Sequence, residues 1–287
     1  MHKSGSTIAL NAGDYQAKIV TVGAGIASLT HRGRHMVIPH HPEEMPLAHL
    51  GKVLIPWPNR ISGGTYHHDG KALQPAINDR TGNTAIHGLL AWVNWQIVEQ
   101  SATSVTLAAF LPPSYGYPFM LSCEVTYQLN EETGLSARIL THNIGDVAAP
   151  YGAGVHPYLT CNLHSVDECE LQLPTNEQFD VKTSTLTTIK ALDFLTRRTI
   201  AATGIDHTFR VLKSTTPWQV TLAHPELTVW LRSTQPWLQI YSGEKLERKG
   251  LAVEPMSCPP DAFNSGIDVV QLKPGEAHQL WFAIGGE

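Results

Sequence analysis

The chain has 287 residues, of which 42% are hydrophobic and 16% are charged, and its 20 Lys and Arg against 25 Asp and Glu give a net charge of −5. This composition supplies enough apolar material for a large buried core and excludes a disordered chain. The uncharged apolar stretches are much shorter than the ~20 residues that span a bilayer. A mildly acidic chain without a basic stripe is also a poor match for nucleic acid or for an anionic membrane surface.

The N-terminal segment lacks an apolar stretch followed by a small-residue cleavage site. We therefore predict that there is no signal peptide and that the protein is cytoplasmic. The four cysteines include no CxxC pair, which favours buried free thiols over a zinc site or a disulfide framework. These cysteines are Cys123, Cys161, Cys169 and Cys258.

Two N-terminal patterns resemble binding motifs without meeting their requirements. Residues 22–28, VGAGIAS, are similar to a dinucleotide-binding loop, but the third glycine is missing and residues 28–31 have the pattern of a strand rather than a helix. We expect a strand pair that contains glycines. Histidines and glutamates gather in residues 35–44, but Pro39 and Pro42 disfavour a helix that would align ligands, which favours a solvated loop over a metal site.

The dominant hydrophobic period along the rest of the chain is two. His67 and His68 lie on a predicted hairpin and point to opposite faces, so at most one of them can serve a site. Residues 124–129 and 168–173 alternate between apolar and polar side chains, and the segments around Val220 and Leu238 continue the pattern. Frequent Gly and Pro turns and the absence of a sustained helical face predict an all-β fold of mostly antiparallel strands. No linker divides the chain, so we expect one domain over residues 1–287.

Polar, titratable residues recur within apolar or glycine-rich strand ends. They occur in LIPWPNRISGGTY from Leu54, in IHG at residues 86–88, HPYL at 156–159, DHTF at 206–209, LQIYSG at 238–243 and EPMSCPPDAFN at 254–264. This ordered set resembles the aldose 1-epimerase family, also called galactose mutarotases, and more specifically a bacterial branch of it. The resemblance covers roughly four-fifths of the chain. It implies a large antiparallel β-sandwich with a sugar-binding groove on one concave sheet and no cofactor.

The resemblance also implies a role for each matching residue. The glutamate of the EP motif, Glu254, corresponds to the catalytic base, and the histidine of the HPY motif, His156, to the general acid. As a base, Glu254 is expected to be ionised in the free protein. The residues expected to bind the sugar are Arg60, His87, Asp206 and Gln239. The segment from Tyr241 to Val253 is shorter than in typical members, so its sugar contacts cannot be inferred from the family.

The implied chemistry is consistent with these residue types. Opening a cyclic hemiacetal requires one base for the C1 hydroxyl and one acid for the ring oxygen, and it requires neither a metal nor a redox centre. A carboxylate and an imidazole suit these roles. Glu254 and His156 each precede a proline, which restricts the backbone to an extended geometry. Trp57, Trp92 and Trp95 are compatible with stacking on a pyranose or with core packing.

Three functions remain open at this stage. The first is a mutarotase for a free aldose, and the second is a mutarotase for a sugar phosphate held by Lys245, Arg248 and Lys249. Glu244 and Glu247 lie in the same segment, so an alternative interpretation is that this segment is a solvated charged turn. The third is a carbohydrate-binding protein without catalysis. In each case we expect a small-molecule sugar ligand, no metal, no nucleic acid, no membrane partner, and a monomer or homodimer.

Overall fold

The computed structural model describes residues 2–212 and 216–287 of the chain. Its largest sheet has nine strands in the order β10-β11-β12-β13-β27-β23-β22-β17-β20, with every neighbouring pair antiparallel. The strands of this sheet are β10 (Gln96–Gln100), β11 (Ser104–Leu111), β12 (Leu121–Asn130), β13 (Gly134–Asn143), β17 (Glu170–Gln172), β20 (Arg198–Thr199), β22 (Trp218–His224), β23 (Leu227–Ser233) and β27 (Ala277–Gly286).

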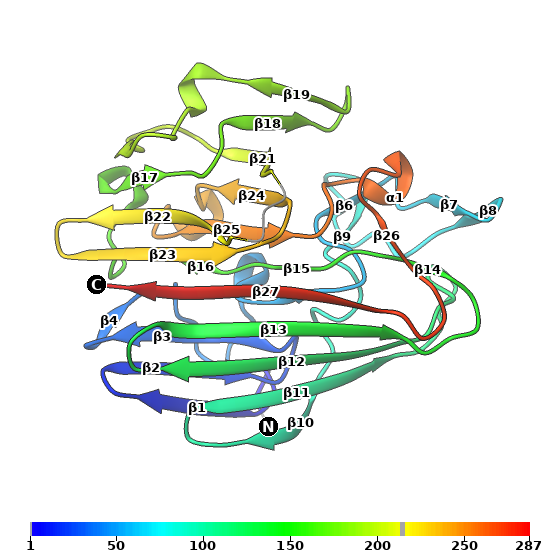
Figure 1. Cartoon of the computed structure of the whole chain (residues 1–287), viewed down its shortest axis with the longest axis horizontal. Helices are drawn as coiled ribbons and strands as arrows, with labels where there is room; N and C mark the ends of the chain where they lie inside the picture. The colour runs from blue at the N-terminus through cyan, green and yellow to red at the C-terminus, as the bar shows by residue number, and fades with distance from the viewer. Residues whose placement is uncertain (1, 213–215) are drawn as a thin grey trace.

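Two further sheets lie against the nine-stranded sheet (Figure 1). A four-stranded sheet contains β1 (Thr7–Ala12), β2 (Tyr15–Val20), β3 (Gly25–His31) and β4 (Arg34–His35). An eight-stranded sheet has the order β19-β18-β21-β24-β25-β15-β5, and β16 also pairs with β25. Its strands are β5 (Val53–Leu54), β15 (Gly154–Val155), β16 (Tyr158–Leu159), β18 (Glu177–Asp180), β19 (Thr185–Thr188), β21 (Asp206–Arg210), β24 (Trp237–Tyr241) and β25 (Leu251–Met256).

Short elements complete the fold. Three two-stranded pairs join β6 (Arg60–Ser62) with β9 (Thr84–Ile86), β7 (Tyr66–His68) with β8 (Lys71–Leu73), and β14 (Ala149–Tyr151) with β26 (Val270–Leu272). Helical structure in the described residues is confined to α1 (Ala262–Ser265) and four single turns, η1 (Leu47–His49), η2 (Val166–Glu168), η3 (Lys190–Leu192) and η4 (Glu244–Leu246). None of these helices has the length and hydropathy needed to cross a membrane.

The core lies between the sheets, and buried tyrosine hydroxyls form hydrogen bonds across it. The hydroxyl of Tyr127 on β12 donates to the carbonyl of Ala24 at 2.7 Å, and the hydroxyl of Tyr15 on β2 donates to the carbonyl of Gly286 at 2.9 Å. Both tyrosine side chains are almost fully buried. Their hydroxyl groups are therefore satisfied where no water reaches them, as buried polar groups require.

The all-β antiparallel prediction is confirmed, and so are most of its elements. β12 alternates buried and exposed side chains from Leu121 to Asn130, and residues 22–28 form the turn between β2 and β3 and the start of β3. His67 and His68 lie on the predicted hairpin, and all four cysteines are free and buried. Trp57 and Trp95 are core residues, whereas 40% of Trp92 is exposed.

The predicted strand at residues 168–173 is wrong at both ends. Glu168 ends the turn η2, whose first N–H groups are capped by the Ser165 side chain, which accepts from the N–H of Asp167. β17 therefore begins only at Glu170 and ends at Gln172. A side-chain cap at Ser165 competes with the extended backbone that the alternating pattern predicts.

Candidate active site

Three neighbouring strands of the eight-stranded sheet carry three of the predicted site residues. Asp206 begins β21, Gln239 is the middle residue of β24, and Glu254 lies on β25. The register pairs Gln239 with Thr208 on one side and with Glu254 on the other. Because paired residues project to the same face of a sheet, the side chains of Gln239 and Glu254 share one face.

Both ends of the Gln239 amide are held by hydrogen bonds. Its Nε2 donates to Oδ1 of Asp206 at 2.7 Å, and its Oε1 accepts from the hydroxyl of Thr208. The bond to Asp206 fixes the orientation of the amide, because exchanging its oxygen and nitrogen would place the amide oxygen against a carboxylate oxygen that can only accept. Gln239 therefore holds the carboxylate of Asp206 in place from the adjacent strand.

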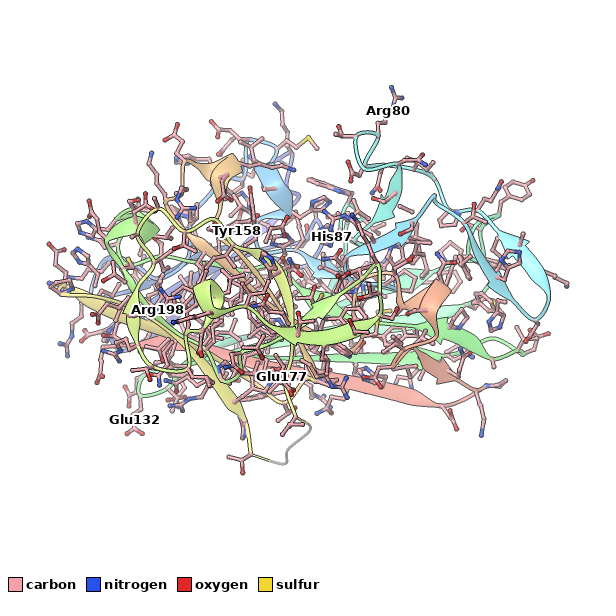
Figure 2. The ribbon with its side chains drawn as sticks, turned by 90° about the horizontal axis from the view of Figure 1, so that it is seen from above. Arg80, His87, Glu132, Tyr158, Glu177 and Arg198 are labelled. Carbon is pink, nitrogen blue, oxygen red and sulfur yellow. The ribbon has the colours of Figure 1, made fainter. Side chains whose placement is uncertain are left out.

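His156 reaches the same face from the segment between β15 and β16. Its backbone N–H donates to the carbonyl of Lys52 at 3.0 Å, and its carbonyl accepts from the N–H of Gly51 at 2.9 Å. Its ring stacks on that of Tyr158 with centroids 5.0 Å apart. In Figure 2, His87 and Tyr158 lie toward the middle of the molecule, whereas Glu132 lies at its periphery.

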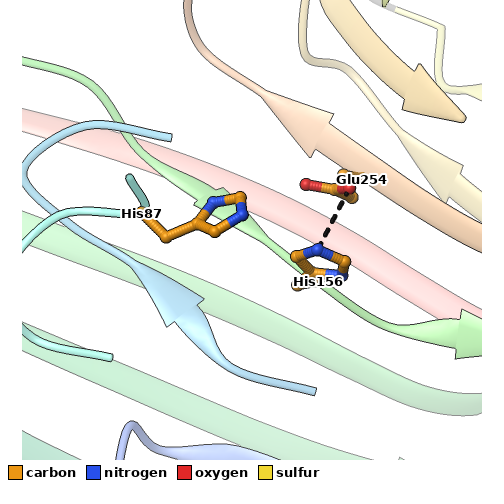
Figure 3. Close-up of side chains that lie close together, drawn as sticks. All are labelled: His87, His156 and Glu254. Carbon is orange, nitrogen blue, oxygen red and sulfur yellow. Dashed lines mark ion pairs between the residues drawn. The ribbon is translucent and has the colours of Figure 1, made fainter. Parts of the chain in front are cut away.

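The imidazole of His156 and the carboxylate of Glu254 are in direct contact. Nε2 of His156 lies 3.3 Å from Oε1 of Glu254, and the two side chains are 7% and 3% exposed (Figure 3). The other polar atom of each side chain, Nδ1 of His156 and Oε2 of Glu254, is buried and has no hydrogen-bond partner within the described residues. Unpartnered buried polar atoms are costly to a folded protein, and they indicate a site built for a ligand or a reaction.

His87 follows β9 in a left-handed conformation that its neighbours enforce. The φ angles of Asn59 and His87 are 54° and 64°, and the N–H of His87 donates to the carbonyl of Asn59 at 2.8 Å. The N–H of Asn59 in turn donates to Nδ1 of His87 at 3.3 Å, so the proton of the neutral ring lies on Nε2. Gly88 has φ +70° and a Cβ there would lie 2.2 Å from the carbonyl oxygen of Ile55, which explains the glycine after the histidine.

Arg60 lies at the start of β6, opposite Ile86 of β9. Its guanidinium donates to the side-chain oxygen of Asn59 at 3.2 Å, and no ion pair involves Arg60 within the described residues. The positive charge of Arg60 is therefore available to a ligand.

These side chains enclose a pocket of about 320 Å³. All six predicted site residues line it, although they come from six different segments between residues 60 and 254. Lys245, a candidate phosphate ligand from the sequence, also lines the pocket. The other lining residues have no site role predicted from the sequence; they are Ala48, His49, Asn59, Asn78, Asp79, Ile86, Tyr158 and Tyr241. Asn59, Tyr158 and Tyr241 lie inside the motifs already singled out, whereas no sequence signal marks His49.

The three basic residues of the short segment before Glu254 have different surroundings. Arg248 forms ion pairs with Asp167 and Glu244 at 2.6 and 2.7 Å, and Lys249 pairs with Glu247 at 2.7 Å. These two residues form a charged turn, as the alternative interpretation predicts, and do not line the pocket. Lys245 does line the pocket, and its ammonium forms no ion pair within the described residues.

Burial controls the protonation of the His156–Glu254 pair. Burial, together with the charges of His49 and Lys245, lowers the pKa of His156 to about 3, and burial followed by the charge of Asp206 raises the pKa of Glu254 well above its ordinary value. Burial therefore favours the neutral form of both side chains. This direction opposes the expectation that Glu254 is ionised in the free protein.

Within the described part of the chain, two groups of side chains have donor atoms close enough together for a metal ion. The first is His87, His156 and Glu254 in the pocket, and the second is His164, Glu168 and His224 at the surface, in each case with ligand atoms within 4.8 Å of one another. The rings of His164 and His224 are stacked with centroids 4.0 Å apart, so their in-plane lone pairs run nearly parallel and do not converge on one ion. Residues 35–44 form no such group among the described residues.

Comparison with known proteins identifies the family. The model of the family described as aldose 1-epimerase matches residues 6–285. The chain belongs to the aldose 1-epimerase family. It is 60% identical to YihR, an uncharacterized protein of Escherichia coli strain K12, over 295 residues that cover 100% of this chain and 95% of YihR.

Solved structures of aldose 1-epimerase homologues share the fold. A GalM/aldose epimerase homologue from C. elegans matches with a TM-score of 0.86 at 20% identity, covering 98% of each chain. Galactose 1-epimerase from Lactobacillus acidophilus matches with a TM-score of 0.83 at 18% identity, covering 98% of this chain and 94% of that chain. At these identities the likeness establishes the β-sandwich architecture of the chain and does not identify a substrate.

Proposed function

We propose that this member of the aldose 1-epimerase family is a mutarotase that interconverts the α and β anomers of an aldose. The observation that carries the proposal is the 3.3 Å contact between His156 and Glu254 in a sugar-sized pocket. The C1 hydroxyl and the ring oxygen of a pyranose are bonded to the same carbon. Two adjacent groups can therefore reach both oxygens at once, which is the geometry that acid–base ring opening requires.

The proposed reaction transfers one proton in each direction. In the charged form of the pair, Glu254 takes the proton of the C1 hydroxyl while His156 donates its proton to the ring oxygen, and the bond between C1 and the ring oxygen breaks. The products are the free aldehyde, a protonated Glu254 and a neutral His156. After rotation about the C1–C2 bond, the C5 hydroxyl attacks the other face of the aldehyde and both protons return.

The directions of the two pKa shifts are compatible with this cycle. The neutral form of the pair, which burial favours, has the same number of protons as the charged form that opens the ring. Only a proton shift across the 3.3 Å contact separates the two forms, and coupled groups of this kind titrate as a pair. A hydroxyl group that donates to Glu254 and a ring oxygen that accepts from His156 stabilise the charged form when the sugar binds.

Polarimetry tests the proposal directly. Freshly dissolved D-glucose, D-galactose and D-mannose and their hexose phosphates are followed with and without the protein. Faster relaxation of the optical rotation of at least one sugar supports mutarotation. Sugar binding without any acceleration would favour the alternative of a carbohydrate-binding protein that lacks catalysis.

A second candidate is a mutarotase for an aldose that carries an anionic group such as a phosphate. The observation that favours it is that Lys245 lines the pocket and that, within the described residues, neither its ammonium nor the guanidinium of Arg60 forms an ion pair. An ammonium and a guanidinium are the usual partners of phosphate oxygens. Acceleration confined to the hexose phosphates, and its loss in Lys245→Ala, would favour this candidate over a free hexose.

We also propose that the protein is cytoplasmic and acts on a small sugar as a monomer or homodimer, without nucleic acid or membrane partners. The four cysteines support this location, because all are free and buried, whereas exported proteins use cysteines mainly in disulfides. The net charge of −5 disfavours nucleic acid as a partner.

A further inference from the structure

His49 is a pocket residue that neither the sequence motifs nor the proposed acid–base pair explains. It ends the turn η1 and its ring lies 4.6 Å from that of His87 and 6.3 Å from that of His156, measured between centroids. The His49 and His156 rings are nearly parallel, at 18°. On its other side the ring of His49 contacts Trp92 at 5.4 Å.

The backbone that carries His49 is held in an unfavourable conformation. Ala48 and His49 both have left-handed φ angles, 49° and 55°, although neither is glycine. The turn is fixed by Lys52, whose N–H donates to the carbonyl of His49 at 3.0 Å and whose carbonyl accepts from the N–H of His156 at 3.0 Å. Strained conformations of this kind persist where the surrounding structure enforces them, and they occur often at functional sites.

The ring of His49 retains its hydrogen-bonding capacity for a ligand. Neither of its nitrogens forms a hydrogen bond within the described residues, and the residue is half-buried at the wall of the pocket. Burial, with the nearby charges of Lys52 and Lys245, lowers the pKa of His49 to about 4. A neutral imidazole offers one donor and one acceptor, as a sugar hydroxyl also does.

We infer that His49 hydrogen-bonds to a hydroxyl group of the bound aldose and thereby positions the sugar against His156 and Glu254. This inference rests on the proposed function and adds a specificity-determining residue to it. His49 lies beside the acid, so the hydroxyl that it binds is one that the pocket brings to the His156 side of the sugar. An aldose that lacks this hydroxyl loses the contact.

The test combines His49 variants with sugars that lack single hydroxyls. His49→Phe keeps the ring contacts with Trp92 and His87 but removes both nitrogens, and His49→Gln restores a donor and an acceptor. The sugar is D-glucose or D-galactose, whichever the wild type turns over faster, with its monodeoxy derivatives. His164→Phe, in the stacked surface pair with His224, is the matched control.

We expect His49→Phe to lower kcat/KM for the parent sugar by about 3- to 10-fold, mainly through KM, as the loss of one hydrogen bond predicts. For one monodeoxy sugar, wild type and His49→Phe should be equal, because the contact is already absent. His49→Gln should recover part of the loss, and His164→Phe should behave as wild type. Thermal unfolding of each variant confirms that it is folded.

Two outcomes would overturn the inference about His49. One is an unchanged kcat/KM in His49→Phe, and the other is the same loss for every monodeoxy sugar, which would indicate a purely structural role. If the wild type accelerates no mutarotation, the proposed function fails, and the same comparison is made with dissociation constants from calorimetric titration. If neither D-glucose nor D-galactose binds, the inference about His49 fails as well.

Discussion

Gln239 on β24 and Glu254 on β25 are cross-strand partners, and their side chains lie on the same face of the eight-stranded sheet. Gln239 is bonded at both ends, to Thr208 and to Asp206, whereas Oε2 of Glu254 has no partner within the described residues. The sheet thus places a fixed amide beside a carboxyl group that still has hydrogen-bonding capacity. This contrast separates a residue that holds the site from the one that we propose reacts in it.

Replacement of Glu254 by glutamine should abolish most of the catalysed mutarotation. Glutamine keeps the shape of the side chain but cannot accept the proton of the C1 hydroxyl. We expect the rate to fall by about 10²–10⁴, as for the loss of one acid–base group, with sugar binding retained. Polarimetry gives the rate and calorimetric titration gives the affinity. Near-normal turnover of a folded Glu254→Gln protein would remove this residue from the mechanism.

The same substitution should change how stability depends on pH. Burial raises the pKa of Glu254 above its ordinary value of 4.5, so above pH 4.5 the folded protein binds a proton that the unfolded chain releases. The free energy of unfolding therefore decreases as pH rises toward the folded-state pKa. Glu254→Gln removes this decrease. We expect the variant to gain stability relative to wild type as pH increases, measured as the difference in Tm.

His156 has the opposite effect on the pH dependence of the free energy of unfolding. Its pKa falls from 6.5 to about 3, so between these values the unfolded chain binds more protons, and acidification through this range lowers the free energy of unfolding. This acid-side loss should persist in Glu254→Gln. Glu132→Gln, on the exposed turn after β12, is the control. A Tm difference between Glu254→Gln and wild type that stays constant from pH 5 to pH 9 would contradict the proposed burial effect.

Loss of the remaining predicted contacts should weaken sugar binding more than it alters the chemistry. Arg60→Ala, His87→Ala and Asp206→Ala each remove a polar group that lines the pocket. Such bonds are worth about 0.5–1.5 kcal/mol, or about 1.5–3 kcal/mol when one group is charged, so each KM should rise severalfold or more. Asp206→Asn is the control for the local structure, since its side-chain oxygen can still accept the hydrogen bond from Gln239. Three variants with wild-type kinetics would refute the site assignment.

Activity should not depend on a metal ion. The proposed ring opening needs only proton transfer, so dialysis against EDTA should leave the polarimetric rate unchanged. The measurement is informative because His87, His156 and Glu254 have donor atoms within 4.8 Å of one another. A rate that disappears on chelation and returns with one particular metal would show that this group binds a required ion.

The single-domain prediction can be tested by calorimetry. Buried side chains as far apart in the sequence as Ile8 and Ile284 belong to one hydrophobic cluster that connects the sheets. We expect one cooperative unfolding transition whose calorimetric and van't Hoff enthalpies agree. Two resolved transitions would indicate separate folding units.

Much of the fold could be predicted from local patterns, because alternation along a strand reports directly which face is buried. β12 and the hairpin of β7 and β8 are examples. The order of strands in the sheets could not be predicted in this way, since neighbours such as β13 and β27 are far apart in the sequence. The strand predicted at 168–173 is shorter in the structure, Glu170–Gln172, and its late start follows from the turn capped by Ser165.

The site shows the same division. Its six predicted residues lie within motifs that carry a family resemblance, and all six line the pocket. His49 could not be assigned from the sequence, because its place depends on contacts between η1 and the segment around His156. Nor could the sequence separate Lys245, which lines the pocket, from Arg248 and Lys249, because that depends on the fold of the short turn before β25. The proximity of His87, His156 and Glu254 likewise arises only when β9, the segment after β15 and β25 meet.

The position of β27 has a consequence for how the chain is made. This strand is the last in the sequence, yet it lies in the interior of the nine-stranded sheet, hydrogen-bonded to β13 on one edge and to β23 on the other. Until residues 277–286 leave the ribosome, β13 and β23 each present an unpaired edge, and such edges template pairing between chains. Translation that stops before Ala277 should therefore yield an aggregation-prone product, even though every residue of the pocket has already been synthesised.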